Sequence, residues 1–194
     1  MKVHREKGKE MNSLLTTSAW LEEELGQKAR PYSTYDFGRQ KDEQQVSFLV
    51  DSLETGFHLV LQYREKLPKD LVMFVGTTNW LGEERHHGVE LVIGYGKSQW
   101  DILRIARTDA ANYNINTEDL ITKLSQYHQQ FGIDILQAET DTVLFDFIQL
   151  PNDLRAFCED CYRFCPDIVD QGFGSIEDFM EAVEVVLFVR LWWD

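Results

Sequence analysis

Apolar and polar positions along this chain follow two periods, one typical of helices and one typical of β-strands. Strands are predicted at residues 46–50, 71–75, 89–93, 133–136, 142–147 and 187–193. Helices are predicted at residues 14–25, 53–67, 117–131, 151–165 and 175–186. Polar stretches predict a linker at residues 26–45 and a loop at residues 77–88, whereas residues 99–105 fit both periods.

The C-terminal quarter contains the clearest boundary signals. Pro151 is expected as the first residue of a helix that runs to Cys165, and Pro166 as the residue that stops it. Residues 167–174 are expected to form a loop in which Gly172 adopts a positive φ. These signals predict two helices joined by a short irregular segment.

The mixed order of helices and strands is typical of an α+β fold rather than of a regular βαβ series. We expect residues 46–194 to form one compact domain with a mixed or largely antiparallel sheet that includes the C-terminal strand. Residues 1–45, the first helix and the polar linker, are expected to be peripheral. Trp192 and Trp193 alternate across the last strand, so at most one of them faces the core.

The charge balance is strongly acidic. The chain contains 33 Asp and Glu against 19 Lys and Arg, which gives a formal net charge of -14. Such a surface repels phosphate backbones and argues against nucleic-acid binding. It attracts basic proteins, although an acidic surface also serves solubility alone. The partner that this composition favours is a basic protein.

Hydrophobic runs are short throughout the sequence. None approaches the ~20 apolar residues that span a bilayer, and no apolar signal-peptide core follows the basic residues of the first ten positions. The sequence therefore predicts a cytoplasmic protein without membrane contact, and it leaves the oligomeric state open.

Three motifs suggest chemistry but have structural explanations. Cys158, Cys161 and Cys165 lie on one predicted helix face, where packing explains them better than a metal site, because no His lies closer than thirty residues to Cys158. Residues 94–98, Gly-Tyr-Gly-Lys-Ser, lack the first glycine of a phosphate-binding loop. The adjacent pair at residues 86–87, two histidines, lies in a charged loop and is expected to be solvated. The sequence thus predicts no cofactor and no metal site.

Carboxylates near the C-terminus leave two interpretations open. Asp167 and Asp170 precede Gly172 in the predicted loop and could meet Asp109 or Asp101 in space. Such carboxylates bind a divalent cation or act as a general acid and base. They also cap helices and accept hydrogen bonds from loop amides, which is the commoner role of Asp in turns.

Three blocks of sequence resemble the bacterial domain-of-unknown-function family 4253, over roughly residues 70–194. They comprise residues 100–104 with 108–113, residues 117–121 with the helix that follows, and residues 165–172 with the final Trp-Trp-Asp. The resemblance implies a compact α+β domain and brings no reaction, cofactor or catalytic residue. The family's recurrent polar positions, which are candidates for a shared pocket or scaffold, are matched here by Arg104, Asp109, Asn112, Asp167, Asp170 and Gln171.

Two functions remain in competition at this point, beside a third possibility: a structural or housekeeping domain whose recurrent residues merely hold the fold. The first is a non-catalytic protein-binding domain, such as an immunity-type protein that neutralises a basic toxin. The alternative is a metal-assisted hydrolase that uses the carboxylates of Asp109, Asp167 and Asp170, with Arg104 binding an anionic substrate.

Overall fold

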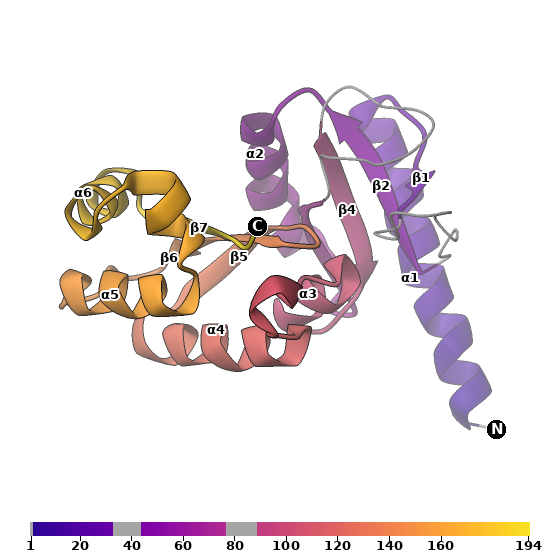
Figure 1. Cartoon of the computed structure of the whole chain (residues 1–194). Helices are drawn as coiled ribbons and strands as arrows, with labels where there is room; N and C mark the ends of the chain where they lie inside the picture. The colour runs from indigo at the N-terminus through magenta and orange to yellow at the C-terminus, as the bar shows by residue number, and fades with distance from the viewer. Residues whose placement is uncertain (1, 33–43, 77–88) are drawn as a thin grey trace. The chain divides into compact units, whose positions relative to one another are not determined.

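The structure, a computed structural model, describes residues 2–32, 44–76 and 89–194, with side chains of the first helix described from Ser13 onward. Its contacts divide the chain into two compact units, Met1–Ala106 and Arg107–Asp194 (Figure 1). Each unit is described by itself below. The boundary expected at residue 45 stays a prediction.

Unit 1 is an antiparallel sheet with helices packed on it. Its strands follow the order β1-β2-β4-β3, and every pair is antiparallel. The strands are β1 (Arg30–Pro31), β2 (Gln45–Val50), β3 (Leu71–Val75) and β4 (Val89–Tyr95). The helices are α1 (Lys2–Leu25), α2 (Leu53–Tyr63), the 3-10 turn η1 (Arg64–Lys66) and α3 (Trp100–Ala106).

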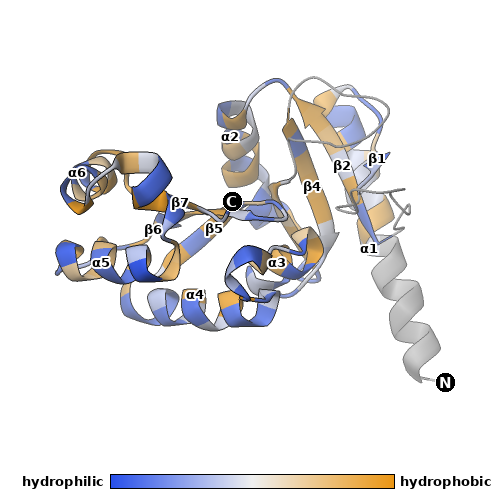
Figure 2. Cartoon of the chain, viewed as in Figure 1, coloured by the Kyte–Doolittle hydropathy of each residue, from blue (hydrophilic) through white to orange (hydrophobic). Residues whose placement is uncertain are grey.

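Strand β4 lies between β2 and β3 and is hydrophobic along most of its length (Figure 2). Helix α2 approaches the sheet closely at Gly56, where an added Cβ would lie 2.8 Å from Cγ2 of Val75. Leu14 and Leu21 of α1 are buried. The first predicted helix therefore contributes to the core of unit 1.

Unit 2 contains three antiparallel strands, in the order β5-β6-β7. Its strands are β5 (Ile133–Ala138), β6 (Thr142–Phe147) and β7 (Phe188–Trp192). Its helical segments are η2 (Ala111–Tyr113), α4 (Thr117–Phe131), α5 (Leu154–Phe164), the π-helical turn η3 (Ile168–Phe173) and α6 (Ile176–Val186). Helix α5 lies between α4 and α6 (Figure 1), in ring contact with α4 through Phe157 and Tyr127.

The structure confirms the α+β class, the hairpin of β5 and β6, and the antiparallel docking of the C-terminal strand on β6. Trp193 is buried whereas Trp192 is half-buried, in agreement with the predicted alternation. Of residues 99–105, which fit both periods, residues 100–105 belong to helix α3. The loop predicted at residues 77–88, with its histidine pair, lies outside the described residues.

Three local predictions are wrong. Helix α5 begins at Leu154, three residues after Pro151, because the side chain of Asp153 caps it by accepting from the Ala156 amide. The predicted loop is largely the π-helical turn η3. Gly172 does not have a positive φ, which Gly174 has instead, at 80°.

Candidate functional site

Asp167 is the centre of the C-terminal hydrogen-bond network. Its Oδ1 accepts from the Tyr113 hydroxyl at 2.8 Å and from Gln171 Nε2 at 2.9 Å. Its Oδ2 accepts from the main-chain N–H of Asp194 at 2.9 Å. The side chain is buried. Asp167 thus joins η2, η3 and the end of the chain.

These donors favour the charged form of Asp167. Burial by itself raises the pKa of the carboxyl, but the hydrogen bonds from Asp194, Tyr113 and Gln171 together lower it below its usual value. The hydrogen bond between Tyr113 and Asp167, together with desolvation, raises the pKa of Tyr113 to about 12. Asp167 is therefore a stable carboxylate and Tyr113 a stable phenol, and neither is suited to exchange protons near neutral pH.

The residues around Asp167 fix the last strand in place. The thiol of Cys165 donates to the Trp192 carbonyl at 2.9 Å, and the indole N–H of Trp193 donates to the Phe164 carbonyl at 3.1 Å. The rings of Phe164 and Trp193 meet edge to face, 5.5 Å apart. We call this assembly the C-terminal clasp: Tyr113, Phe164, Cys165, Asp167, Gln171, Trp192, Trp193 and Asp194.

The other carboxylates of the predicted site bind elsewhere. Asp170 is exposed and accepts from the Tyr162 hydroxyl at 2.7 Å. Asp109 accepts from the main-chain N–H of Ala111 at 3.2 Å, as Asp commonly does in turns. Asn112 is exposed within η2. Of the six predicted site residues, Gln171 is the one that hydrogen-bonds Asp167 within the described part of the chain.

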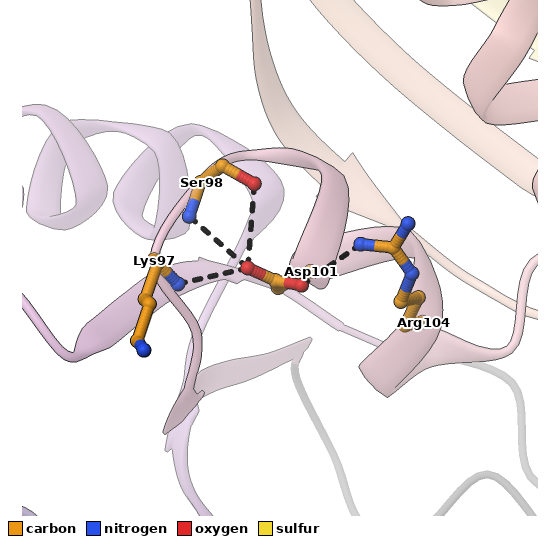
Figure 3. A network of polar contacts seen from close by, with 4 residues as sticks. All are labelled: Lys97, Ser98, Asp101 and Arg104. Carbon is orange, nitrogen blue, oxygen red and sulfur yellow. Dashed lines mark hydrogen bonds and ion pairs between the residues drawn. The ribbon is translucent and has the colours of Figure 1, made fainter.

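Arg104 belongs to unit 1, where it pairs with Asp101 at 2.9 Å (Figure 3). The other oxygen of Asp101 accepts from the main-chain N–H groups of Lys97 and Ser98, at 2.8 and 3.1 Å. These are the amides that a phosphate-binding loop would turn toward its ligand. The carboxylate of Asp101 therefore takes the place that an anion would have at this turn.

The three cysteines are buried and free. Burial raises the pKa of Cys158 to about 12 and that of Cys165 to about 11, and it also raises the pKa of Cys161. A thiol that stays protonated is a poor nucleophile and a poor metal ligand. The burial agrees with the interpretation of the three cysteines as packed core residues.

Within the described ranges, no three His, Cys, Asp or Glu side chains cluster in a way that suits a metal ion. Asp167 already accepts three hydrogen bonds. The metal-assisted alternative thus receives no support from the positions of Asp109, Asp167 and Asp170, and it stays a prediction.

A polar groove lies between α4, α5 and the segment that connects β6 to α5, with a volume of about 490 Å³. Asp160 lines the groove, pairs with Lys123 at 2.5 Å and accepts from the Tyr127 hydroxyl at 2.9 Å. Arg163 also approaches Asp160, at 3.4 Å. Amide side chains line the groove as well: Gln126, Gln130, Gln149 and Asn152.

The charges of this groove compensate one another. Burial raises the pKa of Asp160, but the hydrogen bonds from Lys123 and Tyr127 outweigh it, so the pKa lies below its usual value. Burial is also the main reason that the pKa of Tyr127 is raised. The groove therefore offers fixed charges and amides for binding rather than a group poised for proton transfer. Sequence reasoning missed it, although the i, i+4 spacing of Lys123 and Tyr127 placed both residues on one helix face.

No helix in the described part of the chain is both long enough and apolar enough to cross a membrane. The fold and the clasp define an α+β domain whose distinctive polar residues close its C-terminal strand. The chain belongs to the DUF4253 family, a domain of unknown function, whose sequence profile matches residues 91–194. Comparison with curated proteins gives no match, and neither does comparison with solved structures.

Proposed function

We propose that this chain is a protein-binding domain that recognises a basic partner protein through the outer face of α6. The acidity of the chain is concentrated in unit 2. Residues 107–194 hold 17 acidic and five basic residues, so they carry -12 of the formal net charge of -14. A field of this sign speeds the encounter with a basic protein.

Helix α6 is the observation that carries the proposal. It has four acidic residues and no basic one, and all four are exposed: Glu177, Asp178, Glu181 and Glu184. The opposite face is buried through Phe179 and Val183. The acidic residues therefore share the side of the helix that faces away from the core.

Two of these acids are placed at a small cost to the fold. Glu181 and Glu184 lie in the last two turns of α6, where negative charge opposes the helix dipole. Neither pairs with a Lys or Arg in the described residues, whereas Glu177 pairs with Arg155 at 2.7 Å. Unpaired acids at this end of a helix are explained by a cationic partner better than by local stability.

The partner class that suits such a face is a basic toxin, for example a nuclease domain, which would make this chain an immunity-type neutraliser. Neutralisation requires tight binding and no chemistry from the binder. The engaged state of Asp167 and the raised pKa values of the three thiols are consistent with that role.

The test is a binding titration of the purified chain against a panel of basic nuclease domains at low and physiological salt, with hen lysozyme as an unrelated basic protein. We expect one domain to bind far more tightly than lysozyme. The double variant Glu181→Lys/Glu184→Lys should weaken that complex strongly. The matched control Glu54→Lys/Glu65→Lys changes the net charge equally on exposed positions of unit 1 and should have a small effect. Absence of any complex at low salt, or an equal loss in both variants, would contradict the proposal.

A further inference from the structure

Strand β7 forms one edge of the sheet of unit 2. It pairs with β6 in an antiparallel register in which Phe145 lies opposite Val189. The pairing is framed by two main-chain hydrogen bonds, from Phe147 to the Leu187 carbonyl and from Trp193 to the Asp141 carbonyl. In an antiparallel pair, every second residue bonds its neighbour strand and the residues between them point their main-chain groups away.

The groups of β7 that point away from β6 therefore belong to Phe188, Arg190 and Trp192. The structure agrees, because the Trp192 carbonyl accepts from the Cys165 thiol and the following outward amide, that of Asp194, donates to Asp167. The clasp thus covers the end of this edge. The main-chain groups of Phe188 and Arg190 bond no other residue that the structure describes, and they leave a short open edge.

An exposed apolar cluster precedes this edge. Residues 185–188, which we call the apolar corner, are Val, Val, Leu and Phe, and Val185 is 76% exposed. Leu187 is 50% exposed and has a φ of 62°, in the left-handed region where glycine is favoured. A leucine at this position is costly both in backbone conformation and in exposed apolar surface. If another chain covers the corner, the burial of this apolar surface offsets these costs.

We propose that the open edge of β7 pairs with the same edge of a second copy of this chain. In antiparallel pairing with Phe188 opposite Arg190 of the other copy, the outward groups of both residues form four main-chain hydrogen bonds across a two-fold axis at Val189. Each Phe188 ring then lies beside an arginine of the other copy, a favourable cation–π pair. The apolar corner of each copy comes beside Trp192 of the other.

The charges near the edge favour this strand register, and they favour a second copy of the chain as the partner. The register with Arg190 opposite Arg190 would place two like charges together, which destabilises a strand pair. Arg190 forms no ion pair with another described residue, although unit 2 is strongly acidic. In the proposed dimer it lies beside the C-terminal end of α6 in the other copy, where the free main-chain carbonyls supply negative charge. The dimer is a property separate from binding of a basic partner.

Sedimentation equilibrium of the full chain over a range of concentrations tests the proposal. We expect a mass that rises from 22.7 kDa toward twice that value. Arg190→Pro removes an outward N–H without touching the bonds to β6, so it should weaken the dimer by roughly tenfold or more. Arg190→Ala keeps the N–H and should weaken it less. A wild-type chain that stays monomeric at its solubility limit, or a dimer that Arg190→Pro leaves unchanged, would overturn the proposal.

A disulfide scan checks the register independently of the proline variant. Opposed residues of a hydrogen-bonded pair have Cα atoms about 5.5 Å apart, within the range of a disulfide. The variant Phe188→Cys/Arg190→Cys should therefore form a covalent dimer on mild oxidation. Arg190→Cys alone should not, because the two copies of residue 190 are roughly 8 Å apart in this register. The three native cysteines are buried, so they should not form disulfides in this assay. Equal cross-linking of both variants, or of neither, would refute the register.

Discussion

Gly172 is a residue whose identity is explained by packing rather than by its backbone. An added Cβ would lie 2.7 Å from Cη2 of Trp192, closer than real Cβ contacts allow. The sequence predicted a special backbone angle here, because glycine in a polar segment is typical of turns. Trp192, the residue that requires a glycine here, lies twenty residues further along the chain, and no local sequence pattern shows this contact.

We expect Gly172→Ala to destabilise the protein by about 1 to 2 kcal/mol, since the Trp192 ring must shift within the clasp. The measurement is urea denaturation followed by tryptophan fluorescence. Gly174→Asn is the control, because Gly174 faces open space and asparagine tolerates its positive φ. Equal stability of Gly172→Ala and wild type would show that the ring does not depend on this close approach.

At the scale of elements, strands and helices with strong periodicity were predictable and their boundaries less so. Pro151 and Asp153 both signal a helix start, and the side-chain cap of Asp153 decided the outcome. The π-helical turn η3 escaped prediction for another reason. Hydrophobic periodicity separates helix from strand, but it gives no sign of hydrogen bonds between residues five apart.

The capping box of α4 offers a test at this scale. Asn116 accepts from the amides of Glu118 and Asp119, and the Asp119 side chain accepts from the Asn116 amide. Asn116→Ala should cost about 1 kcal/mol in the free energy of unfolding, whereas Asn116→Asp keeps an acceptor and should cost little. Thermal and urea unfolding of both variants supply the comparison. A similar loss in both would mean that the cap is not what holds this end of α4.

At the scale of the whole molecule, the sequence supplied the residues of the candidate site but not their roles. Asp167 and Gln171 do lie together, whereas Asp109 and Asp170 each bind a group of their own. The decisive partner of Asp167, Tyr113, lies 54 positions away; it belongs to one of the blocks that resemble the family, but no pattern in the sequence marked it as a partner of Asp167. The groove around Asp160 also depends on pairs that only the fold brings together.

The two functional hypotheses differ in their response to metal ions. We expect Mg²⁺ and Mn²⁺ to leave the melting temperature unchanged relative to an equal ionic strength of NaCl, because a ligand stabilises only a native state that binds it. Differential scanning fluorimetry provides the measurement. A metal-specific rise in the melting temperature that Asp167→Ala or Asp170→Ala abolishes would favour the hydrolase hypothesis instead.

The Asp167 carboxylate stabilises the fold, and the proposed binding function depends on the acidic surface instead. Because its folded-state pKa is lowered, its contribution is fully present above the unfolded pKa of about 3.9 and is lost as the pH falls through the folded value. The most direct measurement is the free energy of unfolding of wild type and Asp167→Asn from pH 7 to pH 3. We predict that the variant is less stable by about 2 kcal/mol at pH 7 and that the difference narrows below pH ~4. A variant as stable as wild type at pH 7, or a difference independent of pH, would contradict the claim.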